Sequence, residues 1–351
     1  MVHFILLTII LLAFSNYRGK NLLKASFFLL AIFAILRYNF GNDYRAYMEN
    51  HTWIRNGMEN PFNGEISFYY LNKFTPNFYL LVAITSVFFI YVIYKLIASN
   101  LDGLYVQLAL VIFLINPYLF LMNLSAIRQC IAMCIFIIAT KYIQKRNLLK
   151  YLLLILLAVT FHTSALILFP VYFIVNGDDM NKVQTTILIV GILFLLIEGA
   201  VVTQIIEKGL GYLEISDYIY HFSQDMSNSL RATLLTGVYF LYVVLNLTNL
   251  KGYKLICGKL YLIGLIFGLL AFHFSMFTRI QMYFDIFSIV TIPAILEYHI
   301  ENTTERWKKA INLYFFPALI LLIYFARYYT FFANPMWSKF STYHTIFEAI
   351  L

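Results

Sequence analysis

Long runs of apolar residues alternate with short polar segments along most of this chain. A membrane-spanning helix needs about 20 predominantly apolar residues, and a run of about 17 can be long enough. We therefore predict one transmembrane helix for each of the clear runs, and one for each of two shorter runs. The clear runs are 77–98, 104–122, 185–203, 231–250, 259–277, 280–298 and 311–328, and the shorter ones are 2–16 and 25–40. The run 125–143, which carries Arg128 near its start, predicts one more helix.

The apolar segment 148–176 is longer, and Phe161-His162-Thr163 interrupts it near the middle. It can form one long helix, or two short helices that meet at these residues. Cytoplasmic loops of membrane proteins carry an excess of Lys and Arg. Two helices place all the basic loops on one side of the membrane, whereas one helix would invert every loop after it. With the N-terminus outside, these inside loops are 17–24, 95–103, 141–150, 176–184, 251–259 and 299–310.

The pattern predicts an all-α, polytopic integral membrane protein with about twelve transmembrane helices, in a range of about 10–13. Composition supports this class, because 62% of the 351 residues are hydrophobic and only 12% are charged. A soluble domain of this length could not bury so much apolar surface. We expect residues 1–351 to form a single transmembrane domain.

Charge and cysteine usage narrow the function further. In a membrane protein, a net charge of +8 reflects basic cytoplasmic loops that lie against anionic lipid. It does not indicate nucleic acid as a partner. The three cysteines do not have zinc-binding spacing, and the sequence contains neither a paired-histidine metal motif nor a nucleotide-binding loop. We therefore predict no metal and no cofactor.

Arginine gathers on the predicted outer side, whereas the inside loops mostly use lysine. Arginine offers a planar fork of N–H donors that matches phosphate and carboxylate groups. An arginine at the edge of the hydrocarbon is a candidate functional residue, although it can also simply reach the outer headgroups. The candidates for binding a phosphate-containing group, such as the pyrophosphate considered below, are Arg37, Arg128, Arg231, Arg279 and Arg327.

Three outer segments are long enough to build a site: 41–76, 204–230, which could act as a lid, and the tail 329–351. Nucleotide sugars and ATP are absent outside the cell, so the donor of any group transferred there must carry its own leaving group, as a lipid-linked pyrophosphate does, and arginines at the membrane edge suit that pyrophosphate. His162 could accept the proton of an acceptor hydroxyl, and Asp43 and Glu65 are rival bases. Alternatively, His162 only bonds a neighbouring helix end, Asp43 pairs with Arg45 or Arg37, and Glu65 is solvated.

The central region carries a distinctive set of residues: Asn123, Arg128-Gln129, Ala132, the basic pair Lys145-Arg146, and then Phe161-His162-Thr163-Ser164-Ala165. This set resembles the central motif region of the EpsG-type Wzy polymerases, which act on bacterial O-antigen, capsule or exopolysaccharide. Weaker similarities lie at Arg37 to Tyr47, at Glu65, at Phe277 to Phe287 and at Asn334-Pro335.

The resemblance implies a GT-C-like, metal-independent glycosyltransferase in the bacterial cytoplasmic (inner) membrane, with its active site facing the periplasm. It would transfer the growing glycan from undecaprenyl pyrophosphate to a new lipid-linked repeat unit and release undecaprenyl pyrophosphate. Implied partners are the lipid-linked donor and acceptor, the bilayer, a chain-length co-polymerase and a flippase. Supporting roles fall on residues within the matching segments: Gln129, Asn123, Ser164, Tyr44 and Tyr283.

Two other functions stay open. An O-antigen-type ligase would use the same donor, but such ligases usually carry a larger second outer loop than 204–230. A flippase or transporter for lipid-linked sugars is expected to line a central cavity with charges. Among the predicted spans, only Glu198 and Asp285 are acidic residues near the middle or outer part of the membrane.

Overall fold

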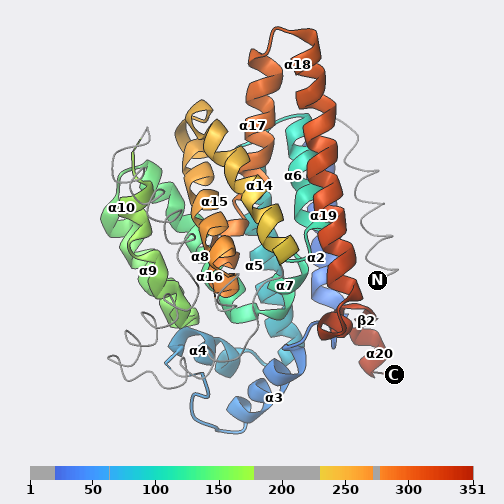
Figure 1. The fold of residues 1–351 in the computed structure, drawn as a ribbon. Coiled ribbons are helices and arrows are strands. Elements are labelled where there is room, and N and C mark those ends of the chain that lie inside the picture. The colour runs from blue at the N-terminus through green and yellow to red at the C-terminus, as the bar shows by residue number, and fades with distance from the viewer. Residues whose placement is uncertain (1–19, 63, 178–229, 272–276, 351) are drawn as a thin grey trace. The chain divides into compact units, whose positions relative to one another are not determined.

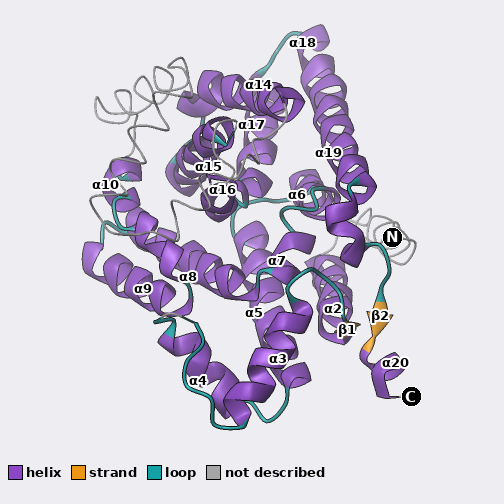
Figure 2. Cartoon of the chain, turned by 60° about the horizontal axis from the view of Figure 1, so that its bottom comes forward, coloured by secondary structure: helices purple, strands orange, loops and turns teal. Residues whose placement is uncertain are grey.

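The computed structural model describes residues 20–62, 64–177, 230–271 and 277–350. Most of these residues are helical, and a single two-stranded sheet is present among them (Figure 1, Figure 2). The predicted all-α class is thus confirmed. The predicted spans 2–16 and 185–203 and nearly all of the outer segment 204–230 lie outside the described residues.

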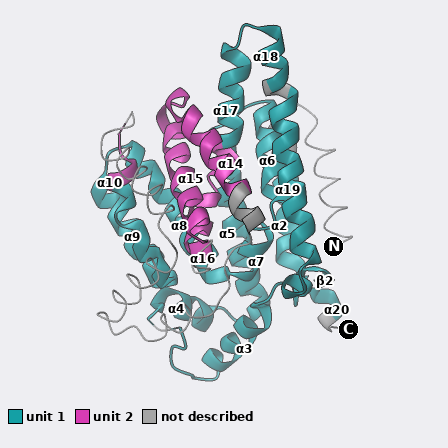
Figure 3. Ribbon diagram, in the orientation of Figure 1, with its two compact units in different colours: residues 1–172, 292–351 teal, residues 173–291 magenta. Residues whose placement is uncertain are grey.

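The chain divides into two compact units, Met1–Tyr172 with Ile292–Leu351, and Phe173–Thr291 (Figure 3). The first unit holds most of the elements. They are α2 (Lys20–Leu36), β1 (Arg37–Tyr38), α3 (Tyr44–Arg55), α4 (Ile66–Phe74), α5 (Phe78–Ala98), α6 (Leu104–Ile115), α7 (Leu121–Ser125), α8 (Ile127–Gln144), α9 (Leu148–Phe161), η1 (Thr163–Leu168), α18 (Arg306–Ala310), the π-helical turn η3 (Ile311–Phe315), α19 (Phe316–Ala333), η4 (Pro335–Phe340), β2 (His344–Thr345) and α20 (Ile346–Ile350).

The second unit contains α14 (Leu230–Asn246), η2 (Leu247–Asn249), α15 (Gly252–Leu270) and α16 (Phe277–Asp285), and α15 packs against both α14 and α16. The helices α10 (Val171–Val175) and α17 (Ser288–Asn302) cross the boundaries between the units. The helix α15 begins earlier than the predicted span 259–277. Lys259, predicted at the end of an inside loop, lies within this helix, is buried, and donates from Nζ to the carbonyl of Gly177 at 3.0 Å.

Four described helices are long and apolar enough to cross a membrane: α5, α8, α15 and α19. The pair α16 and α17, bent by 51° at a short break, could be a fifth. Shorter apolar helices include α6, α9 and most of α2. The protein is therefore membrane-embedded, while the twelve-span count and the GT-C-like fold stay predictions.

The predicted continuous span 104–122 is wrong. The helix α6 ends at Ile115, and Asn116 has an extended backbone with ψ of 104°. Pro117 explains this, because the ring of a proline disfavours helical backbone in the residue before it. The chain resumes helical structure in the short α7 and, after a break at Ala126, in α8.

The two-helix prediction for 148–176 is confirmed in its main point. The helix α9 ends at Phe161, and His162 is extended, with φ −157° and ψ 116°. The hydroxyl of Tyr151 in α9 donates to the carbonyl of Leu168 at 2.6 Å. In one straight helix these residues would be roughly 25 Å apart, so the chain after His162 folds back along α9.

The tail packs onto the end of α2 and the segment that follows it. β1 pairs antiparallel with β2, with Arg37 opposite Thr345. The ring of Tyr343 stacks on Phe33 with centroids 4.4 Å apart, and its hydroxyl donates to the Phe33 carbonyl at 2.7 Å. These contacts fix the start of the predicted outer segment 41–76.

Candidate active site

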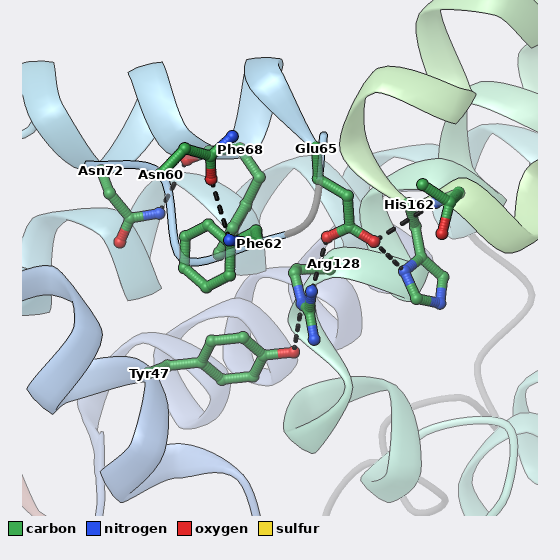
Figure 4. Close-up of polar contacts among 9 residues, drawn as sticks. Tyr47, Asn60, Phe62, Glu65, Phe68, Asn72, Arg128 and His162 are labelled. Atoms are coloured by element: carbon green, nitrogen blue, oxygen red, sulfur yellow. Dashed lines mark hydrogen bonds and ion pairs between the residues drawn. The ribbon is translucent and has the colours of Figure 1, made fainter. Parts of the chain in front are cut away.

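Three segments of the first unit converge on one carboxylate (Figure 4). Glu65 precedes α4, Arg128 is in the first turn of α8, and His162 follows α9. Arg128 Nη1 lies 2.6 Å from Glu65 Oε2, and His162 Nδ1 lies 2.7 Å from Glu65 Oε1. The Glu65 side chain is 3% exposed, whereas Arg128 and His162 are 30% and 20% exposed. The carboxylate is thus the buried hub of a cluster whose other members reach solvent.

The backbone around Glu65 turns its side chain away from its own helix. The Glu65 N–H donates to the Phe62 carbonyl at 3.0 Å, closing a turn, and its carboxylate does not cap α4. The hydroxyls of Ser67 and Thr160 lie 2.7 Å apart and join the start of α4 to the end of α9. This contact brings Glu65 to the end of α9.

The break after α9 presents two donors to Glu65. His162 is extended, so its ring leaves the helical path, and the backbone N–H of Thr163 also donates to Oε1 at 3.2 Å. The hairpin of α8 and α9 returns the chain to the same end, where Arg128 begins α8. The two residues of the sequence motif, Arg128 and His162, therefore both contact Glu65 in the structure.

Aromatic side chains surround the Arg128 guanidinium, and sequence reasoning did not assign them to the site. The guanidinium carbon lies 5.2 Å from the centre of the Phe62 ring and 5.8 Å from that of Tyr47. The Tyr47 hydroxyl accepts a long hydrogen bond of 3.4 Å from Arg128 Nε. Both aromatic residues lie in the predicted outer segment 41–76, and Tyr47 also ends the segment Arg37 to Tyr47 that resembles the family.

The surroundings keep Glu65 ionised. Burial alone would raise the pKa of Glu65, but the hydrogen bond with His162 and the positive charge of Arg128 outweigh it and hold the pKa below its ordinary value. An ionised carboxylate accepts hydrogen bonds but cannot donate them. His162 Nδ1 therefore donates to Glu65, and in a neutral imidazole with that tautomer Nε2 is an acceptor.

Two groups of the cluster remain available for a ligand. Among the described residues, no hydrogen-bond partner contacts His162 Nε2 or Arg128 Nη2. The cluster thus offers a proton acceptor and a cationic donor, both attached to Glu65. Such an arrangement can take a proton from a hydroxyl and bind an anionic group beside it.

Asp43 and Tyr44 have other partners. Ser125 Oγ donates to Asp43 Oδ2 at 3.3 Å and accepts from the Asp43 N–H at 3.1 Å. The predicted alternative pairing of Asp43 with Arg45 is not found, because Arg45 Nε donates to Asn39 Oδ1 at 2.9 Å. Tyr44 is buried, and its hydroxyl donates to the Arg37 carbonyl at 3.2 Å.

Arg37 is buried apart from the Glu65 cluster, with 1% of its surface exposed. Its guanidinium donates to Ser86 Oγ at 2.6 Å, to the Leu124 carbonyl at 3.1 Å and to the Ala34 carbonyl. Arg37 also lines a small cavity together with Asn123, whose Nδ2 donates to the Leu119 carbonyl at 2.8 Å. Binding of pyrophosphate by Arg37 stays a prediction, and it would require these internal bonds to break.

The other candidates are distributed over both units. Gln129 is buried beside Arg128, Ser164 lies in η1, and Arg327 lies in α19, all in the first unit. Arg279 and Tyr283 lie in α16 of the second unit. Arg231 is in the first turn of α14, and its side chain is outside the described part. Their roles stay predictions.

No group of three or more His, Cys, Asp and Glu side chains suited to a metal ion occurs in the part of the chain that the structure describes. The sequence model of the EpsG family matches residues 20–345. The chain belongs to the EpsG family. No curated protein and no solved structure matches it.

Membership of the EpsG family supports a role in polysaccharide polymerisation and a glycosyltransferase-like activity. The matched residues include the whole Glu65 cluster, the Arg37 and Asp43 region, and α16. In this EpsG-family protein, the predicted motif residues Arg128 and His162 therefore lie in one geometrically defined site.

Proposed function

We propose that this EpsG-family protein joins lipid-linked oligosaccharide repeat units, with Glu65, Arg128 and His162 at its active site. The growing glycan would move from undecaprenyl pyrophosphate to a hydroxyl of a second undecaprenyl-pyrophosphate-linked repeat unit. The single observation that supports this proposal best is the Glu65 carboxylate, which binds Arg128 through one oxygen and His162 through the other.

His162 acts as the general base. Its Nδ1–H donates to Glu65, so Nε2 accepts the proton of the attacking acceptor hydroxyl. The new bond forms between that oxygen and the anomeric carbon of the donor glycan, while the bond from this carbon to the pyrophosphate oxygen breaks. Glu65 stabilises the positive charge that develops on the imidazole and holds the ring in the required tautomer.

Arg128 stabilises the leaving group. Negative charge grows on the pyrophosphate as the glycosidic bond breaks, and a fixed cationic donor lowers the energy of that charge. Nη1 is bound to Glu65, so Nη2 is the edge directed to phosphate. The rings of Tyr47 and Phe62 beside the guanidinium restrict its orientation. The active site faces the periplasm of the cytoplasmic membrane in this proposal.

The replacement Arg128→Lys tests the phosphate-binding role. Lysine keeps the charge but has no planar fork that could bind Glu65 and a phosphate at once. We expect purified protein in vesicles, given one defined lipid-linked repeat unit, to lose the ladder of polymer products while its folding is unchanged. The matched control is Arg45→Lys, because Arg45 is exposed and its one hydrogen bond within the described part of the chain is to Asn39. Full-length polymer from the Arg128→Lys protein would contradict the proposal.

A further inference from the structure

One face of α4 is apolar and exposed. Ile66, Tyr70 and Phe74 are 54%, 46% and 76% exposed, and they are spaced four residues apart, which puts them on one side of a helix. The opposite side carries the buried residues Phe68 and Asn72. The helix therefore turns three large apolar side chains outward, the reverse of what water favours.

The helix α4 is followed at once by a helix long and apolar enough to span a membrane. Only Thr75, Pro76 and Asn77 separate α4 from α5, and the Asn77 side chain caps α5 by accepting from the Leu80 N–H at 2.9 Å. Along α5 from Leu80 to Tyr91, large apolar side chains are exposed at Leu80, Ile84, Val87 and Tyr91, and the basic Lys95 is exposed nearer the other end of the helix. These apolar side chains form the surface that faces lipid in a spanning helix. A short helix at the end of such a span lies at the depth where hydrocarbon meets headgroups.

Basic groups accompany the aromatic ones on this face. Lys73 Nζ lies 5.6 Å above the Tyr69 ring, and Arg55 Nη1 donates to the Lys73 carbonyl at 3.1 Å. Both Lys73 and Arg55 are exposed. Aromatic rings with basic side chains at their edge are typical of the membrane–water interface, because the rings enter the headgroup region and the cations reach phosphate.

We propose that α4 is an interfacial helix, with Ile66, Tyr70 and Phe74 inserted at the boundary between headgroups and acyl chains and Lys73 and Arg55 directed to headgroup phosphates. The partner is the lipid bilayer itself, and the proposal needs only that the protein is membrane-embedded. Glu65 immediately precedes Ile66, so the Glu65 cluster lies at headgroup depth. At that depth a group that binds phosphate meets the phosphates of a lipid, whereas a soluble sugar phosphate has no reason to concentrate there.

Tryptophan fluorescence tests this placement without using activity. The three native tryptophans, Trp53, Trp307 and Trp337, are replaced by Phe, and one tryptophan is introduced by Tyr70→Trp or, in a second variant, by Phe74→Trp. Glu59→Trp, at an exposed position of the preceding loop, is the matched control. Each protein is placed in vesicles of phosphatidylcholine and phosphatidylglycerol with acyl chains brominated near the headgroup or near the chain end.

We expect shallow bromines to quench tryptophan at 70 and 74 at least twofold more than deep bromines do, and iodide in the water to quench it weakly. The control at 59 should respond to iodide and not to bromine. Three results would overturn the proposal: strong iodide quenching at 70 and 74, stronger quenching by deep than by shallow bromines, or protection from both quenchers. The last result would mean that protein, such as a second copy of this chain, covers the face.

Discussion

The replacement Glu65→Gln separates the charge of this residue from its shape. Glutamine has the same length, and its carbonyl oxygen can still accept hydrogen bonds from His162 and from the Thr163 N–H. It cannot, however, offer negative charge to Arg128 and to the protonated imidazole at the same time. The variant therefore tests whether the carboxylate charge assists proton removal, as the geometry of the cluster indicates.

The expected loss follows from electrostatics. Opposite unit charges about 4 Å apart attract by about 4 kcal/mol at an effective dielectric constant of about 20. Because His162 and Arg128 are 20% and 30% exposed, solvent screens part of this attraction, and we take about half of it, about 2 kcal/mol. Each 1.4 kcal/mol or so of lost transition-state stabilisation is a factor of about ten in rate. The polymerisation rate should therefore fall about 30-fold.

The assay is the initial rate of the polymer ladder from one defined lipid-linked repeat unit in vesicles. Glu59→Gln removes an exposed carboxylate from the same loop and should keep the full rate. Thermal unfolding of both variants shows whether any loss reflects folding. A Glu65→Gln protein that is folded and polymerises within about threefold of the parent would refute the role of the carboxylate charge.

Three further results are expected. The variant His162→Gln keeps a donor for Glu65 but no proton acceptor, so the polymerisation rate should fall about 10²–10⁴-fold, and near-normal polymer would reduce His162 to a positioning role. The pKa of Glu65 is lowered on folding, so its contribution to stability is complete above the unfolded pKa of about 4.3 and is lost as the pH falls through the folded pKa. On acidification, the melting temperature of the parent should therefore drop more than that of Glu65→Gln. Equal drops would contradict this. Gly41 and Gly57 have similar φ of 98° and 96°, but a Cβ at Gly41 would lie 2.9 Å from Ser125 Cβ, whereas Gly57 faces open space. Gly41→Ala should therefore destabilise the protein by about 1–3 kcal/mol more than Gly57→Ala. Equal melting temperatures of the two variants would contradict this.

Local pattern was enough to predict part of this architecture. The apolar period located α5, α8 and α19 to within a few residues, and the interruption at His162 correctly indicated the fold back after α9. Charge distribution favoured two helices in that segment, which places Arg128 and His162 at one end of a hairpin. Both inferences depend on contacts between neighbours in sequence, which a pattern can encode.

The role of Glu65 depended on contacts that no local pattern encodes. Its partners Arg128 and His162 lie 63 and 97 residues away in sequence, so the same residue could equally have been a solvated carboxylate. Arg37 is a second residue whose surroundings the sequence did not reveal. Its position after an apolar run suggested a group that reaches outward, but Ser86 and the Leu124 carbonyl hold it inside.

The pairing of β1 with β2 has a consequence for biogenesis. Tyr343 and Phe33, which contact each other beside this pairing, are 310 residues apart in sequence. During synthesis, β1 therefore has no partner strand until almost all the later helices have been made. The Gly41 and Asp43 loop gains its last contacts only then, including the bond from the Gly41 N–H to the Lys339 carbonyl. An interrupted chain would thus display an unpaired strand edge, a feature by which cellular quality control could distinguish it from the finished protein.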